Sequence, residues 1–270
     1  MPRLANDLRL VLAALLMVTL TSVAARAQSM LDMVDLSTDQ FTKAEMSRAD
    51  IEAAIAKLPP GEKLDLFGKA LNKLDLSGMD LRRVSLQAAR LMGSDFSNAN
   101  LEGVNLDSAW SLNSKWTGAN LKGASLFGTQ LVGANLDGAN MTGARLAGDF
   151  SKASLKGAKL DGADLSADEK NQSMGLMRGT FRSADLTGAS MKGANMRRVL
   201  IEYTTLNGAD LTGASLAGSE LGGSDFTGAD VTGADFEGAD VNSARIHAMK
   251  NADKALNLDK AKNFDRSIRN

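Results

Sequence analysis

Apolar residues recur at every fifth position over most of this chain, from Leu66 to Ile246. A small residue mostly stands two positions before each apolar centre, and Asp, Asn or Ser mostly stands immediately before it. A period of five fits neither the helical period of 3.6 nor the strand period of 2, so each unit must contain a tight bend. Gly, Asn and Asp adopt such bends at low conformational cost. Four units therefore predict one square coil of about twenty residues, and stacked coils pair their backbones about 4.8 Å apart.

The repeated units share a short consensus, seen in Ala99-Asn100-Leu101, Ala163-Asp164-Leu165 and Ala209-Asp210-Leu211. This pattern resembles the pentapeptide-repeat family over residues 62–246. The resemblance implies an all-β solenoid, a right-handed quadrilateral β-helix of about nine coils, with the centre and the small residue inside. It implies little about activity, because one fold can carry several unrelated functions.

The five-residue spacing breaks twice. The step from Leu146 to Phe150 is four residues, and the step from Leu165 to Leu176 is eleven. The longer step predicts a loop at residues 166–175 that leaves one face of the solenoid. Loops held by a rigid scaffold often carry function, although a neutral insertion explains the sequence equally well. The candidate partner-binding residues of this loop are Asp168, Glu169 and Lys170.

The two tryptophans are expected to point in opposite directions. Trp116 occupies a centre next to Ser111, and a large residue beside a small one keeps the core volume roughly constant. Trp110 precedes a centre and is expected to point outward, on the same face as Arg90, Gln130 and Asp149. We expect an exposed apolar partner-binding patch there, formed by Met92, Trp110, Leu112 and Val132. The alternative is that the N-terminal segment folds back and covers it.

Acidic residues gather near the end of the repeats. Residues 206–244 contain seven acidic residues and no Lys or Arg. The repeat predicts that acids on adjacent coils stack about 5 Å apart, and like charges so placed repel. A counter-ion or a basic partner is therefore expected, either the basic segment 247–270 as a cap or a divalent cation. The candidate acidic surface consists of Asp210, Glu220, Asp225, Asp230, Asp235 and Asp240.

Residues 1–27 have the features of a secretory signal peptide. Arg3 and Arg9 precede an apolar run of eleven residues, which is shorter than the roughly 20 residues that a membrane span needs. The small residues of Ala25-Arg26-Ala27 predict cleavage after Ala27 and a mature chain that begins at Gln28. The sequence therefore predicts a periplasmic or secreted protein with no transmembrane anchor in its mature form.

The ends of the solenoid are expected to carry short helical caps, because an exposed coil is an unpaired strand edge. Residues 28–61 are predicted to form a lead-in and a capping helix over 42–58, which Pro59-Pro60-Gly61 ends. Residues 247–270 are predicted to form a basic C-terminal cap with a helix or helix–turn over 251–267.

Composition argues against catalysis. The formal net charge is −1, with no Cys and one His. The absence of Cys excludes disulfides, thiolate nucleophiles and Cys-based metal sites, and the single His247 excludes sites with two imidazoles. No set of nucleophile, base and orienting residue can be assembled around His247. We therefore expect no enzyme activity, no cofactor and no resident metal.

The interpretation that fits these features is an exported, non-catalytic scaffold that presents rigid faces to another envelope protein, and a homodimer is possible. One alternative is an acidic DNA mimic that binds a type II topoisomerase, an activity that the resemblance implies for some members. The predicted signal peptide argues against this alternative, and nucleic acid itself is an unlikely partner. Another alternative is a divalent-cation-binding protein.

Overall fold

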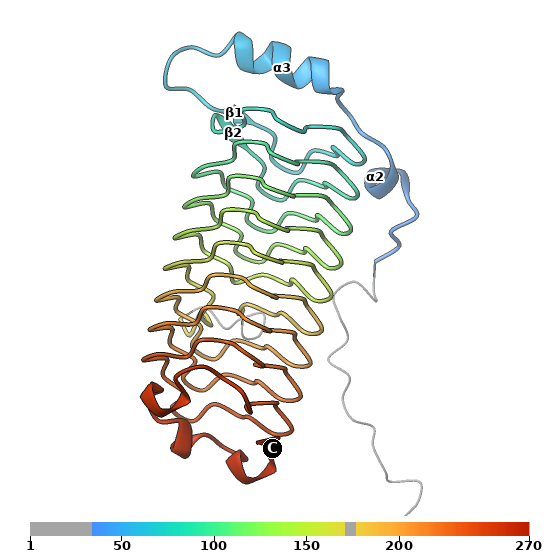
Figure 1. Cartoon of the computed structure of the whole chain (residues 1–270). Coiled ribbons are helices and arrows are strands. Elements are labelled where there is room, and N and C mark those ends of the chain that lie inside the picture. The colour runs from blue at the N-terminus through green and yellow to red at the C-terminus, as the bar shows by residue number, and fades with distance from the viewer. Residues whose placement is uncertain (1–33, 171–176, 270) are drawn as a thin grey trace, which may run out of the picture. The chain divides into compact units, whose positions relative to one another are not determined.

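The computed structural model describes residues 34–170 and 177–269. The chain divides into two compact units, one ending at Thr38 and one beginning at Asp39. In the described part of the first unit, the Asp35 carboxylate accepts hydrogen bonds from the Ser37 backbone and hydroxyl. The second unit contains a column of stacked coils (Figure 1). Its elements are α2 (Asp39–Thr42), α3 (Arg48–Ala56), β1 (Leu64–Asp65), β2 (Val84–Ser85) and the 3₁₀ helices η2 (Ala252–Lys254), η3 (Leu258–Lys260) and η4 (Phe264–Arg266).

The coils are held together by parallel backbone pairing. β1 pairs with β2 in parallel, and further parallel bridges recur at every fifth residue, most of them joining a residue to the one twenty positions later, as Arg90 joins Trp110. At this bridge the Leu91 N–H donates to Trp110 O (2.6 Å), and the Trp110 N–H donates to Ala89 O (2.8 Å). Each side of a coil is too short for a long strand, so the ladders run along the column rather than within one segment. This confirms the predicted β-helical solenoid.

The apolar centres fill the interior of the coils. Trp116 is 1% exposed and stacks on Phe96 with 4.1 Å between ring centroids, which confirms its predicted place in the core. Its indole N–H donates to the Ser114 hydroxyl (2.7 Å), and the Ser111 hydroxyl donates to the same oxygen (2.8 Å). Because Ser111 is small, it leaves space for the indole. Its hydroxyl also holds the Ser114 hydroxyl, which accepts the hydrogen bond of the indole N–H.

The four-residue step is present in the structure. Gln130 pairs with Asp149, nineteen positions later, so this coil is one residue shorter than its neighbours. The shorter side draws the backbone inward at Gly148, where a Cβ would lie 2.6 Å from Thr129 O. Only glycine fits so close to another backbone.

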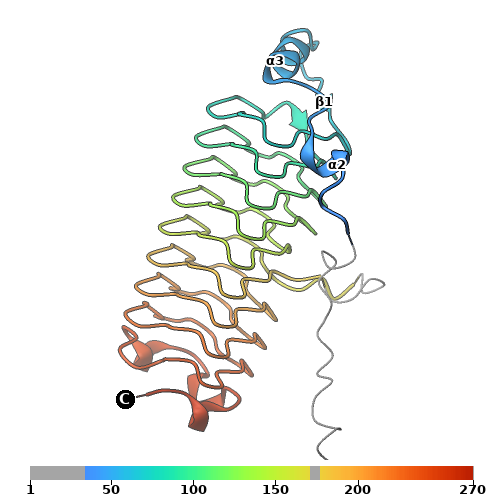
Figure 2. The same ribbon diagram turned by 90° about the vertical axis from the view of Figure 1, so that its right-hand side faces the viewer.

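The connection after Leu165 differs from the predicted eleven-residue step to Leu176. Leu176 lies outside the described residues, and so do 171–175 of the predicted loop. Thr180 pairs with Asp149, and Phe181 stacks on Phe150 with 4.8 Å between ring centroids. Phe181 therefore takes the core position that follows Leu165. The described residues of the connection, 166–170 and 177–179, lead away from the stack of coils (Figure 2).

The C-terminal segment continues the column, contrary to the expectation that the repeats end at Ile246, and the helix or helix–turn expected over 251–267 takes the form of three short 3₁₀ helices within the last coil. Backbone pairing continues through Asp230–Lys250, Asp235–Leu256, Asp240–Lys262 and Arg245–Ile268. The sides of this last coil contain six residues instead of five. The extra residue turns each bend into a three-residue 3₁₀ helix that starts after an asparagine in the left-handed conformation, at Asn251, Asn257 and Asn263.

The N-terminal end carries a short α-helix. α3 begins after Ser47, whose side chain accepts the Asp50 N–H while the Asp50 carboxylate accepts the Ser47 N–H. This capping box stabilises the first turn, and Ile51 anchors the helix in the core. Within the expected range 42–58, the structure has α3 together with the end of a separate α2. No helix among the described residues is long and apolar enough to cross a membrane. The predicted signal peptide lies outside the described residues.

Candidate interaction surfaces

The expected apolar patch is partly covered by the chain itself. Leu112 is buried, and Met92, Trp110 and Val132 are half-buried. The Phe41 ring from α2 lies against Trp110 with 5.4 Å between ring centroids. The expectation of an exposed patch is therefore wrong at Leu112. At Trp110 the alternative holds, since an N-terminal segment packs over the indole.

Polar contacts attach residues 39–45, which we call the covering segment, to the coils. The Asn72 side-chain amide donates to Gln40 O (3.0 Å) and Lys43 O (2.7 Å). The Arg90 guanidinium donates to Gln40 O (2.9 Å). The Glu45 backbone donates to Ala70 O (2.7 Å). Its carboxylate lies 3.0 Å from Lys69 Nζ, and this partner lowers the pKa of Glu45 below its usual 4.5.

The described loop residues are anchored rather than free. The Glu169 carboxylate pairs with Arg198 (2.9 Å), and the Lys170 N–H donates to the Asp168 carboxylate (3.0 Å). At the other end of the connection, Arg178 pairs with Glu220 (2.8 Å). Ion pairs to later coils therefore hold both ends of the connection, and its use by a partner remains a prediction.

The acidic residues stack as the repeat predicts. Asp210 pairs through its backbone with Asp230, and Glu220 pairs with Asp240. Three of these carboxylates, those of Asp210, Asp225 and Asp230, accept a hydrogen bond from a threonine hydroxyl two residues later, as Asp210 does from Thr212 (2.6 Å). Lysine and arginine also approach them. Lys192 lies 3.1 Å from Asp210. Burial raises the pKa of Asp210, but the hydrogen bonds from Thr212 and then from Lys192 outweigh it and lower this pKa, while Asp210 raises the pKa of Lys192.

Asparagines of the last coil cap the acidic coil above it. The side-chain amides of Asn251, Asn257 and Asn263 donate to Asp230, Asp235 and Asp240, at 3.1, 2.8 and 2.8 Å respectively. Lys254 and Lys260 in turn donate to the oxygens of Asn251 and Asn257. The C-terminal segment thus compensates the negative charge of these acids chiefly through hydrogen bonds from asparagine amides. The Thr232 hydroxyl, the Thr232 N–H and the Asn251 amide together lower the pKa of Asp230 to about 2.

No compact cation site is formed by these acids. Among the described residues, no group of three or more His, Asp or Glu side chains is close enough to hold a metal ion. The repeat spaces the carboxylates along the coils, and the neighbouring hydroxyls and amides occupy their oxygens. The arrangement therefore offers fixed rows of polar groups rather than a converging set of ligands.

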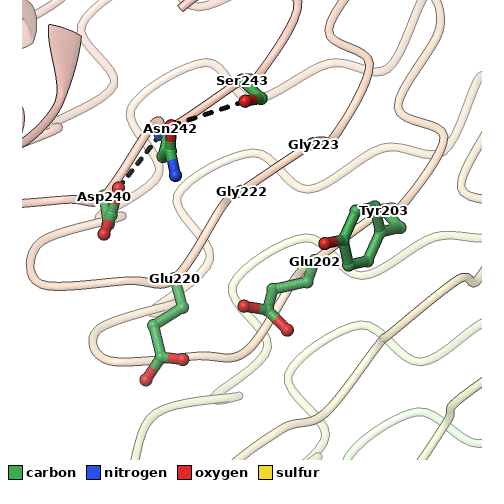
Figure 3. A pocket seen from close by; sticks show the side chains of 8 residues that line it. All are labelled: Glu202, Tyr203, Glu220, Gly222, Gly223, Asp240, Asn242 and Ser243. Atoms are coloured by element: carbon green, nitrogen blue, oxygen red, sulfur yellow. Dashed lines mark hydrogen bonds between the residues drawn. The ribbon is translucent and has the colours of Figure 1, made fainter. Parts of the chain in front are cut away.

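Sequence reasoning missed a surface feature around Tyr203, the single tyrosine of the chain. Tyr203 is 68% exposed and has a φ of 54°, in the left-handed region. It stands at the bend position that glycine usually occupies in this repeat. A tyrosine at this position was the sequence signal that could have revealed the surface feature. Beside it lies a hollow of about 290 Å³ (Figure 3). The lining residues are Glu202, Tyr203, Glu220, Gly222, Gly223, Asp240, Asn242 and Ser243.

Comparisons with known proteins agree with this architecture. The sequence model of the family described as pentapeptide repeats matches eight copies, at residues 71–109, 113–148, 179–202 and 204–242, which together make up just over half of the chain. No curated protein matches in sequence.

Solved structures with a similar fold include HetL, a pentapeptide repeat protein involved in heterocyst differentiation regulation in the cyanobacterium Nostoc sp. strain PCC 7120. It is 26% identical, with a TM-score of 0.40, over 83% of this chain and 100% of that one. QnrB1, a plasmid-mediated fluoroquinolone resistance protein, is 16% identical, with a TM-score of 0.47, over 74% of this chain and 92% of that one.

Proposed function

Because the chain belongs to the pentapeptide repeat family, we propose that it is an exported, non-catalytic scaffold whose outward side chains bind a protein of the cell envelope. The proposed export rests on the features of residues 1–27. The proposed binding role rests on the regular outward rows of the column, because side chains held in fixed positions lose little conformational entropy when a partner binds.

The observation that carries the proposal is the side-chain bonding between coils. The Asn120 amide donates to the Asn100 oxygen one coil earlier (3.0 Å). The Ser125 hydroxyl donates to Asp107 and the Ser154 hydroxyl to Asp137, each at 2.5 Å. Such bonds fix the rotamers of neighbouring outward residues relative to one another. A face built this way is pre-organised for a protein partner and brings no reacting groups together.

The acidic coils support a DNA mimic less well than a protein-binding scaffold. A duplex presents uncompensated charge at regular intervals. Here Lys192 and Arg178 reach Asp210 and Glu220, and Arg245 lies 4.0 Å from Asp225. Asparagine amides occupy the oxygens of the acids on the next coil. A chain exported through residues 1–27 would also be separated from the chromosome.

Export is tested by fractionating cells that express the full chain and determining the N-terminus of the product by mass spectrometry. The expected product lies outside the cytoplasm and begins at Gln28. A cytoplasmic product that keeps residues 1–27 contradicts export and makes inhibition of a type II topoisomerase the next assay. Analytical ultracentrifugation of the purified product shows whether a homodimer forms.

Partner binding is tested by placing a photo-reactive amino acid at one exposed position on each face and irradiating intact cells. Suitable positions are Lys122, Lys156, Glu237 and Asn242, which lie on the four different sides of the coils. The expected result is a cross-linked protein product from one face and none without irradiation. If no face yields a product, the scaffold role is wrong.

A further inference from the structure

We propose that the hollow beside Tyr203 binds an arginine or lysine side chain of a protein partner, with the tyrosine ring as its platform. This inference rests on the proposed scaffold function and specifies the face and the chemistry of the partner. It depends on three features of the described residues: the conformation of Tyr203, the glycine below its ring and the carboxylates around the hollow.

The conformation of Tyr203 is unfavourable for the fold alone. In the left-handed region the Cβ of a side chain crowds the following carbonyl oxygen, and glycine avoids this clash. Among the described non-glycine residues with positive φ, Tyr203 is the only aromatic one. Its ring is largely exposed, so core packing does not compensate the strain. Strained residues that the core does not need are characteristic of binding sites.

The coil below provides a seat for the ring. A Cβ on Gly223 would lie 2.7 and 2.8 Å from two ring carbons of Tyr203, so any other residue there would displace the ring. Gly222 and Gly223 themselves add no side chain to the lining of the hollow (Figure 3). One side of the ring therefore rests against the backbone, and the remainder is accessible from the hollow.

The charges favour a cation. Glu202, Glu220 and Asp240 line the hollow on successive coils. Arg182 and Arg178 reach Glu202 and Glu220 from earlier coils, on the N-terminal side. Asp240 bonds to neutral donors, the Asn242 N–H (3.0 Å) and the Asn263 amide (2.8 Å).

No cation among the described residues lies above the Tyr203 ring. In the described part of the chain, arginines lie over Phe127 and Phe264, and none lies over Tyr203. A guanidinium or ammonium group in the hollow would meet both the accessible ring and a carboxylate. These two contacts together are the usual basis for recognising a cation on an aromatic platform.

The test measures the fluorescence anisotropy of a short labelled peptide of alternating arginine and serine, titrated with the mature chain. A peptide with citrulline in place of arginine has the same shape without the charge. Tyr203→Gly removes the ring and relieves the backbone strain, whereas Tyr203→Phe keeps the ring. Phe67→Ala is the matched control, because Phe67 is a similarly exposed aromatic residue (62%) on the first coil.

We expect the arginine peptide to bind at least about tenfold more tightly than the citrulline peptide. Tyr203→Gly should weaken this binding about tenfold while the thermal midpoint stays constant or rises. Tyr203→Phe and Phe67→Ala should bind like the unaltered chain. Equal binding of both peptides, unchanged binding by Tyr203→Gly, or a lowered midpoint in Tyr203→Gly would each overturn the inference.

The outcome is separable from that of the proposed function. If the peptide test fails while a photo-reactive group at Lys122, Lys156 or Glu237 still cross-links a protein, the scaffold function stands and the Tyr203 site is wrong. A cross-link from Asn242, which lines the hollow, that disappears in Tyr203→Gly supports both.

Discussion

One face of the column carries two outward aromatic residues with opposite surroundings. Trp110, in the N-terminal half, is covered by Phe41. Tyr203, in the C-terminal half, rests on Gly223 and is open to solvent. The repeat places both residues on the outside by the same rule. The difference is that a segment from outside the repeats packs over only one of them.

This contrast shows how burial is determined in a solenoid. Every residue of a regular coil is used for the core, the bends or the outward rows, so a coil has no chain left over to cover its own face. Covering requires residues before, after or inserted between the repeats. The pattern of the repeat therefore predicts which residues point outward but not which of them a partner can reach.

The largest expected difference between the two halves follows from removing the aromatic contact. Phe41→Ala should lower the free energy of unfolding by about 2–3 kcal/mol, because it removes a buried ring from the covering segment and exposes Trp110. Tyr203→Ala should change it by no more than about 0.5 kcal/mol. Urea denaturation of both variants checks this. Equal losses would show that the two residues are structurally equivalent and would end the comparison.

A smaller difference is expected for two asparagines at equivalent positions. Asn72 and Asn242 each follow a core residue on this face. The Asn72 amide is buried and donates to two carbonyls of the covering segment, whereas Asn242 is exposed. Asn72→Ala should cost about 1–2 kcal/mol, since it leaves Lys43 O without its donor and Gln40 O with Arg90 alone. Asn242→Ala should be close to neutral, and a similar cost at both positions would contradict the role of Asn72 as a tether.

The smallest expected effect is the loss of stability at low pH. Lys69 lowers the pKa of Glu45 in the folded state, so the folded chain binds this proton less readily than the unfolded chain. The stabilisation is therefore complete above pH 4.5 and is lost as the pH falls through the lowered pKa. Glu45→Gln should lower the thermal midpoint slightly at pH 7 and make little difference at pH 2. A pH-independent difference would show that Glu45 acts through packing instead of charge.

The sequence predicts well those features that follow from the five-residue repeat. Trp116 in the core and the stacked Asp210–Asp230 pair follow from the five-residue period, because position within the unit determines direction. The covering of Trp110 could be proposed but not decided, since Phe41 lies outside the repeats and its docking depends on shape. Such contacts form between segments without a shared period.

The last coil was misread for a different reason. Asn251, Asn257 and Asn263 recur with a period of six, and so do the acids and bases around them. A search for a period of five sees this region as irregular, and its spaced apolar residues then suggest a helix. The hollow beside Tyr203 was missed because it depends on two glycines one coil later, and the five-residue period does not distinguish them from other outward positions.

The stacking register also determines how the surface of such a chain can change over evolutionary time. Most backbone bridges join residues twenty positions apart, as Asn100 and Asn120, so duplication of a whole coil re-forms every bridge. An insertion of five residues also keeps the apolar centres inside, but it turns every later face by a quarter. Residues such as Tyr203 would then move to another side. Duplication of a whole coil therefore alters only the length of the column, while insertion of a single five-residue unit rearranges its faces. A gene can thus vary the length and the faces independently.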